Sequence, residues 1–212
     1  MAPDEIRYKK VLLVEGEDEK NVFTALLRFL NISEVDVIPA GGKENFKGKF
    51  SVLSKRTNFD NIENLGFIRD AEENAAKSSF GSMYNIIAPV LADFALPKTP
   101  GEVARTGSKT CGIFIMPDCA SSGMLEDLCI KSVENQDLFK NANEYVEKAK
   151  AEYEKDKAGN KKFNMPKALV QAYLAGRVPV VNSLGLAVQK KYFDFNNVAF
   201  DSVKKFLKEL FC

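Results

Sequence analysis

The sequence predicts an α/β protein, built on a central, mainly parallel sheet of four strands flanked by helices, with a helical C-terminal part. Short apolar runs alternate with segments whose apolar residues have helical spacing. Such alternation favours right-handed crossovers and a parallel sheet that helices cover on both faces. The 212 residues, 45% of them hydrophobic, are enough for a sizeable core.

The first half of the predicted sheet lies within the first 55 residues. Residues 11–14 form an apolar run flanked by charge, which is typical of a buried parallel strand. Apolar side chains at helical spacing follow over residues 18–30. A second strand is expected at residues 35–39, before a pair of glycines, and another amphipathic helix over residues 46–53.

The second half of the sheet is expected between residues 65 and 116. Residues 65–68 predict the third strand, residues 83–91 an amphipathic helix, and residues 113–116 the fourth strand. Residues 96–109 contain two prolines and two glycines, so we expect an exposed loop before the fourth strand.

The C-terminal third divides into a charged and an apolar segment. Residues 131–162 have few apolar positions and predict at most a solvated helical insertion. Residues 163–212 are apolar with helical spacing, so we expect helices that pack on the core formed by residues 1–130. We therefore expect a single domain over residues 1–212.

The composition excludes several kinds of chemistry. The chain has no histidine, so a histidine general base, a Ser-His-Asp triad and a histidine-containing zinc site are impossible. The formal net charge of +1 argues against a strongly basic nucleic-acid coat protein, although it leaves room for a local basic patch.

The N-terminus and the cysteines bear on location. The first ten residues are charged and lack a signal peptide's apolar stretch, and no run approaches the length of a membrane span. The four cysteines include no C-x-x-C pair; we expect Cys111, Cys129 and Cys212 to be reduced thiols in or near the core, and Cys119 to be the one exposed. A bacterial, cytoplasmic protein without a membrane partner is the expectation.

Carboxylates follow three of the four predicted strands. Glu15 follows the first, Asp70 and Glu72 end the third, and Asp118 follows the fourth. Ligands of open parallel sheets bind at the carboxyl ends of the strands, where these acids would repel one another unless a cation neutralises them. Oxygen ligands favour Mg²⁺, Mn²⁺ or Ca²⁺. The alternative is that each acid caps the helix that follows it.

Three motifs in this order resemble a toprim domain, the metal-binding module of topoisomerases, bacterial primases, small ribonucleases and overcoming-lysogenization-defect nucleases. They are VLLVEGEDE at residues 11–19, FIRDAE at 67–72 and IFIMPD at 113–118. A group of small bacterial and archaeal toprim-like proteins of unknown function is a closer match, because it is also similar at residues 122–127 and 167–175.

The resemblance implies roles for particular residues. Glu15 would be the general acid/base or a metal ligand, with Gly16 and Glu19 completing its motif. Asp70 and Glu72 would hold a divalent ion, Mg²⁺ or Mn²⁺, that Asp118 could also bind, and Glu126 would contribute to a second metal. Glu72 stands where the family commonly has Asp.

Basic residues are candidates for phosphate contacts. Lys167 follows Pro166 and is expected early in a helix, where a lysine opposes the helix dipole. A phosphate contact would explain it, and a solvated lysine is the alternative. Lys43, after two glycines, is a further candidate, while Arg69 is expected to pair with a nearby acid.

Two function classes remain open. The first is an enzyme, a nuclease or other hydrolase or phosphotransferase that uses Mg²⁺ or Mn²⁺ on nucleic acid or a nucleotide. The second is a non-catalytic module with the same fold that binds a nucleotide or a partner; either could act as a homo-oligomer. A flavodoxin-like or receiver-like protein is a third reading, but no predicted strand ends in the lysine that a receiver needs.

Overall fold

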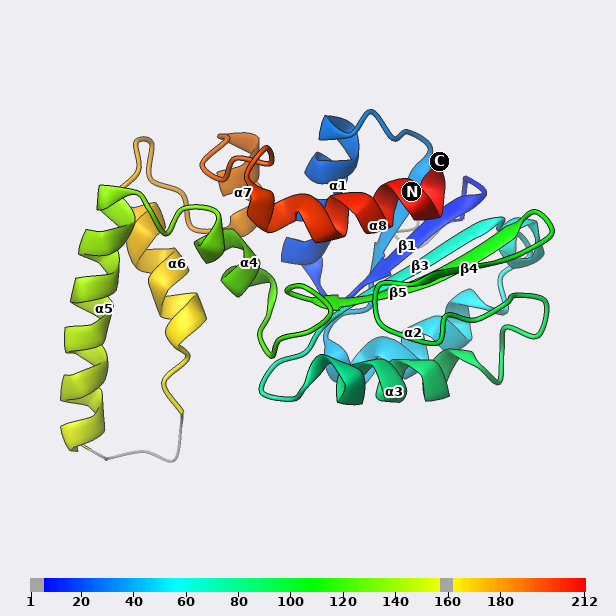
Figure 1. The fold of residues 1–212 in the computed structure, drawn as a ribbon, viewed down its shortest axis with the longest axis horizontal. Coiled ribbons are helices and arrows are strands. Elements are labelled where there is room, and N and C mark those ends of the chain that lie inside the picture. The colour runs from blue at the N-terminus through cyan, green and yellow to red at the C-terminus, as the bar shows by residue number, and fades with distance from the viewer. Residues whose placement is uncertain (1–5, 157–161) are drawn as a thin grey trace.

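The computed structural model describes residues 6–156 and 162–212, and it has a five-stranded sheet with the order β2-β1-β3-β5-β4 (Figure 1). The strands are β1 (Lys10–Val14), β2 (Val35–Pro39), β3 (Asn64–Asp70), β4 (Val103–Thr106) and β5 (Lys109–Met116). The first four strands in this order are parallel, so the predicted α/β class and mainly parallel sheet are confirmed.

The fifth strand corrects the predicted count of four. Part of the segment 96–109, expected to be a loop, forms β4, which pairs antiparallel with β5 through Thr106 and Lys109. The side chains of β4 are half-buried or exposed, so the strand has no apolar run that sequence periodicity could detect. It closes one edge of the sheet.

Two hydrophobic clusters cover the two faces of the sheet. On one face lie α2 (Phe46–Leu53) and α3 (Ala76–Ile87). The other face carries α1 (Glu17–Phe29), α4 (Leu125–Lys131), α7 (Leu184–Gln189) and α8 (Asp201–Phe211), and Figure 1 shows α1 and α8 opposite α2 and α3. Short 3₁₀ turns occur at Lys43–Asn45, Phe59–Asn61 and Val198–Phe200.

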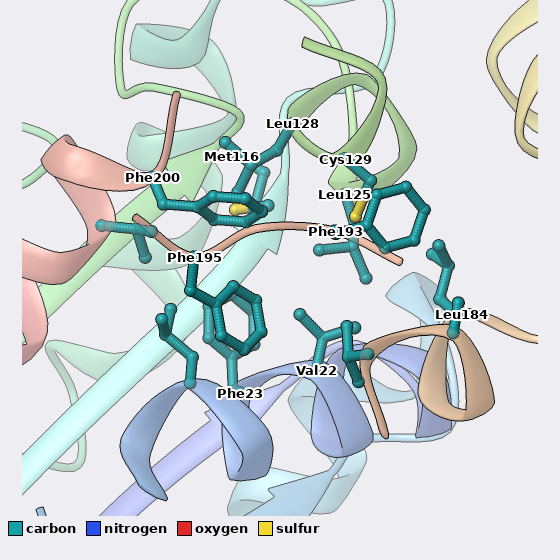
Figure 2. Packing of buried hydrophobic residues seen from close by; sticks show 14 of the residues in the cluster. Val22, Phe23, Met116, Leu125, Leu128, Cys129, Leu184, Phe193, Phe195 and Phe200 are labelled. Carbon is teal, nitrogen blue, oxygen red and sulfur yellow. The ribbon is translucent and has the colours of Figure 1, made fainter. Parts of the chain in front are cut away.

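The second cluster fixes α1 and α4 relative to the sheet. Figure 2 shows Val22 and Phe23 of α1, Met116 of β5 and Leu125 of α4 meeting the aromatic side chain of Phe200 and its neighbours. All five are buried. Because apolar interiors pack at crystal-like density, this core holds the starts of α1 and α4 beside the ends of β1 and β3.

The charged segment predicted at residues 131–162 contains a long helix, α5 (Asp137–Asp156), which pairs with α6 (Met165–Ala175) at one end of the molecule (Figure 1). Its charged side chains face solvent, while Phe139 and Val146 belong to the same cluster as Tyr173 of α6. The segment is therefore a helix with one apolar stripe.

The cysteines are all free, and their burial differs in part from expectation. Cys111 and Cys129 are buried and Cys119 is half-buried, whereas Cys212 is exposed. The expectation for Cys212 is wrong because the chain ends there, after the last apolar turn of α8. None of the described helices has the length and apolar character needed to cross a membrane.

Candidate metal centre

Four carboxylates gather at the carboxyl ends of β1 and β3: Glu15, Glu19 in the first turn of α1, Asp70 at the end of β3, and Glu126 in the first turn of α4. Burial raises the pKa of Asp70 well above its usual value, and the negative charges of Glu19, Glu15 and Glu126 raise it further. The four acids thus form one electrostatically coupled group.

Asp70 also ties the sheet to α4. The backbone N–H of Leu125 donates to Asp70 Oδ1 (N···O 3.1 Å), and the N–H of Met124 donates to the Asp127 carboxylate (2.8 Å). These bonds satisfy donors of the first turn of α4 that have no partner within the helix. They bring Glu126 toward the end of β3.

Glu15 has an oxygen that is free for a ligand. Its Oε2 is buried and accepts no hydrogen bond from any described residue. Burial raises the pKa of Glu15, while a backbone hydrogen bond from Asp70 and the charge of Arg69 lower it. A buried oxygen without a donor is unfavourable unless a proton or a cation reaches it.

Glu19 lies over the turn that begins α1. A Cβ placed on Gly16 would come within 2.9 Å of Glu19 Oε2, so the glycine leaves room for this carboxylate. Burial is the main cause that raises the pKa of Glu19, and the charges of Glu15 and Glu126 also raise it. The Glu-Gly-x-x-Glu spacing therefore brings two carboxylates to one turn.

Lys167 reaches the group through Glu126. Its Nζ lies 3.7 Å from Glu126 Oε1, and Asn164 accepts a hydrogen bond from its backbone N–H at the start of α6. The lysine side chain is 62% exposed, whereas that of Glu126 is 13% exposed. Burial raises the pKa of Glu126, and the positive charge of Lys167 opposes that rise.

The two remaining predicted ligands have other partners. Glu72 forms an ion pair with Lys43 of the first 3₁₀ turn. Asp118 Oδ1 accepts hydrogen bonds from the backbone N–H groups of Ala120 (3.1 Å) and Ser121 (2.8 Å). Partial burial would raise the pKa of Asp118, but these bonds lower it. The structure therefore brings Glu15, Glu19, Asp70 and Glu126 together. Glu72 pairs with Lys43 beside them, and its charge also raises the pKa of Glu15, while Asp118 is held in a local turn outside the group.

The four grouped acids fit a hard divalent cation in their chemistry. They supply only carboxylate oxygens, which Mg²⁺ and Mn²⁺ prefer, and the unpartnered Glu15 oxygen is available as a donor. Within residues 6–156 and 162–212, no three acidic or thiol side chains are spaced to bind an ion as they stand. Binding would therefore require the flexible Glu side chains to rotate.

Two features of this region depend on contacts that the sequence does not signal. The Asp127 carboxylate accepts a hydrogen bond from the backbone N–H of Met124, and because the N-cap of α4 is a methionine, the Ser/Thr-x-x-Glu/Gln signature of a capping box is absent. Arg69 was expected to pair with an acid, but its burial beside Glu15 depends on the packing of α3 and has no signal in the sequence.

The sheet order and its acidic edge define an α/β protein with a mainly parallel sheet and carboxylates at the strand ends. The chain belongs to the family described as "Protein of unknown function (DUF3226)", which matches residues 9–212. No curated protein matches it.

Solved structures of the C-terminal region of the Xanthomonas campestris pv. campestris OLD protein are similar in fold. The iodine-phased structure has a TM-score of 0.50 at 14% identity, and the match covers 97% of this chain and 96% of that one. The mercury-phased structure has a TM-score of 0.49 at 14% identity, covering 97% of each chain. At this identity, the first of these matches shows a shared fold.

Proposed function

We propose that the protein is a Mg²⁺- or Mn²⁺-dependent enzyme that hydrolyses phosphodiesters, or transfers phosphoryl groups, on nucleic acid or a nucleotide. The observation that supports this most directly is the coupling of Asp70 to Glu15, Glu19 and Glu126 at one edge of the sheet. Buried acids that repel one another weaken a fold, so such a group is typical of a functional site.

Asp70 and Glu19 would hold the ion, with Glu126 on the side of α4, which leaves the free oxygen of Glu15 for proton transfer. A bound divalent ion supplies charge stabilisation for phosphoryl transfer and lowers the pKa of water. The carboxylates would orient the ion, and the buried surroundings of Asp70 would keep bulk water away from that carboxylate. Asp118 lies outside this group, and Glu72 pairs with Lys43 at its margin.

Glu15 is the proposed general acid/base. Its pKa is raised, mainly by burial, so its Oε2 can accept a proton from an attacking water more readily than an exposed carboxylate. In hydrolysis, the water oxygen forms a bond to phosphorus, the bond to the leaving oxygen breaks, and Glu15 takes the water proton. Lys167, exposed at the margin, would contact phosphate.

The test combines metal binding with turnover. Calorimetric titration with Mn²⁺ and Mg²⁺ is expected to show binding that Asp70→Asn removes. The matched control is Asp93→Asn. Asp93 is exposed and pairs with Lys109, which begins β5 and so lies at the edge of the sheet opposite the carboxylates. Labelled single- and double-stranded DNA and RNA should be cleaved with metal, and Glu15→Gln should lose that cleavage.

Two outcomes would reject the enzyme. Absence of metal binding to the wild-type protein would remove the basis of the proposal. Metal binding without turnover of any nucleic acid or nucleotide would instead support the non-catalytic binding module that shares this fold.

A further inference from the structure

A buried arginine adjoins the carboxylates on the α3 side of the sheet. Arg69, the second-last residue of β3, is 7% exposed. One of its terminal nitrogens donates to Ser82 Oγ (3.2 Å), but its Nε is buried and has no partner among the described residues. An unpaired buried donor on a charged group is unfavourable. An anionic ligand could provide the acceptor that this side chain lacks.

A second cation lies close to Arg69. Lys43 follows the turn at Gly41 and Gly42, and the positive charge of Arg69 acts on both Lys43 and Glu15. Two positive charges that act on one another favour an anion between or beside them. In the structure that anion is a carboxylate of the protein itself.

The Glu72 carboxylate is the anion that pairs with Lys43 Nζ. Glu72 has a left-handed backbone (φ 57°), and reciprocal hydrogen bonds with Gly123, each 2.7 Å, hold it there. Both side chains of the pair are 35% exposed. Ion pairs of this exposure contribute little to stability, so a ligand can replace one partner.

The glycine turn leaves space beside this pair. Gly42 has a φ of 105°, and a Cβ built on it would meet no atom within 4 Å. Its N–H donates to the backbone oxygen of Glu15 (2.9 Å), which fixes the turn next to the carboxylates. A ligand at Lys43 would therefore lie beside Glu15.

We propose that Arg69 and Lys43 form a phosphate-binding subsite next to the metal-binding carboxylates, and that phosphate displaces the Glu72 carboxylate from Lys43. The inference rests on the proposed function and adds how its substrate would be held. The ligand is a phosphate oxyanion, either of a nucleotide or of a nucleic-acid backbone. Arginine provides several fixed N–H donors for such oxygens, and lysine provides a point charge.

Glu72 gives the sharpest contrast with the role that the toprim resemblance implies. If Glu72 were a metal ligand, replacing its carboxylate would weaken metal binding. If Glu72 instead occupies a phosphate subsite, neutralising its carboxylate would leave metal binding intact. It would also strengthen phosphate binding, because the Glu72 carboxylate would no longer compete for Lys43.

The experiment measures fluorescence anisotropy of a labelled short oligothymidylate in Mg²⁺, with the probe verified intact on a gel. Inorganic phosphate and thymidine monophosphate serve as competitors. We expect Arg69→Lys and Lys43→Gln each to weaken binding about ten-fold, and Glu72→Gln to strengthen it several-fold. The control Lys47→Gln changes the same charge at an exposed position of α2 and should change affinity less than about two-fold.

The competitors identify the source of the phosphate. Competition by thymidine monophosphate at low concentration indicates a nucleotide ligand, and competition by oligonucleotide alone indicates a nucleic-acid backbone; either supports the subsite. Thermal melts confirm that each variant folds, and Lys43→Gln, at a half-buried position, carries the test if Arg69→Lys does not fold.

Mn²⁺ titration of the same variants separates this inference from the proposed function. Unchanged metal affinity in all variants is expected. The subsite is overturned if Arg69→Lys and Lys43→Gln bind the oligonucleotide as tightly as the wild type. It is also overturned if the wild-type protein binds metal but binds neither the oligonucleotide nor the phosphate competitors. Loss of Mn²⁺ binding in Glu72→Gln overturns the displacement and restores Glu72 as a ligand. Failure of the wild-type protein to bind Mn²⁺ rejects the proposed metal enzyme instead, and the anisotropy series still decides the subsite.

Discussion

The Leu125 backbone N–H donates to Asp70 Oδ1 at 3.1 Å, and this bond joins the end of β3 to the first turn of α4. The same carboxylate is buried among Glu15, Glu19 and Glu126. Asp70 is therefore useful to the local structure as an acceptor, while its charge is unfavourable there.

The substitution Asp70→Asn separates the acceptor from the charge. Asn keeps an oxygen that can accept from Leu125, but it removes a buried negative charge beside three others. We expect the melting temperature without metal to rise by about 2–4 °C, because roughly 1 kcal/mol of repulsion is relieved in a domain of this size. Stabilisation by added Mg²⁺ should disappear. Differential scanning calorimetry in EDTA and in Mg²⁺ measures both, and a variant less stable than wild type in EDTA would contradict the argument.

We also expect the stability difference between the wild type and Asp70→Asn to depend on pH. The pKa of Asp70 is higher in the folded state than in the unfolded chain, so its folded state binds protons more readily. Its contribution to stability is most favourable below the unfolded pKa of about 4 and is lost as pH rises through the folded pKa. The stability advantage of Asp70→Asn in EDTA should therefore be small near pH 4 and grow toward neutral pH. A difference that stays constant over this range would show that Asp70 is not protonated preferentially in the fold.

Gly16 provides a test that leaves every carboxylate in place. In Gly16→Ala, the new Cβ would lie 2.9 Å from Glu19 Oε2, so the flexible Glu19 side chain must move. We expect metal affinity to fall about ten-fold with the fold retained, because Gly16 has an extended backbone that alanine can adopt. The control is Gly81→Ala in α3, where a Cβ meets nothing and alanine should stabilise the helix by about 0.5–1 kcal/mol. Isothermal titration with Mn²⁺ decides, and equal affinities for the two variants would exclude a role for the Glu19 position.

The sequence predicts the parts of this site that depend on strand ends. Glu15 directly follows an apolar run and Asp70 ends β3, and parallel strands bring such positions to one edge. It could not predict the position of Glu72, because that depends on a left-handed residue and on the distant Lys43. It also could not predict that hydrogen bonds with nearby backbone N–H groups hold Asp118.

The fold shows which elements hydrophobic periodicity can detect. Buried strands and amphipathic helices leave a periodic pattern, and the four parallel strands were predicted from it. The edge strand β4 has no such pattern, since its side chains are half-buried or exposed and its pairing with β5 is what makes it a strand. This pairing is local, because a two-residue turn at Gly107 and Ser108 joins the two strands, and such a Gly-Ser pair is a hairpin signal that periodicity alone does not detect.

Two glycines of the sheet determine how closely α8 can pack. A Cβ on Gly66 of β3 would lie 2.5 Å from Leu210 Cδ2, and a Cβ on Gly112 of β5 would lie 2.7 Å from Phe206. Because Leu210 and Phe206 are buried, they have little room to move. Gly66→Ala is therefore expected to reduce the free energy of unfolding by about 1–3 kcal/mol. Urea unfolding measures this loss of stability, and the control Gly48→Ala in α2, where a Cβ meets no atom within 4 Å, should show no loss.

A double-mutant cycle tests whether Leu210 is the residue that the new methyl group meets. Leu210→Ala should destabilise the Gly66→Ala protein less than it destabilises the wild type, because Leu210→Ala removes the Leu210 methyl group that clashes with the new Cβ. Strict additivity of the two changes would mean that the sheet, not α8, absorbs the added methyl.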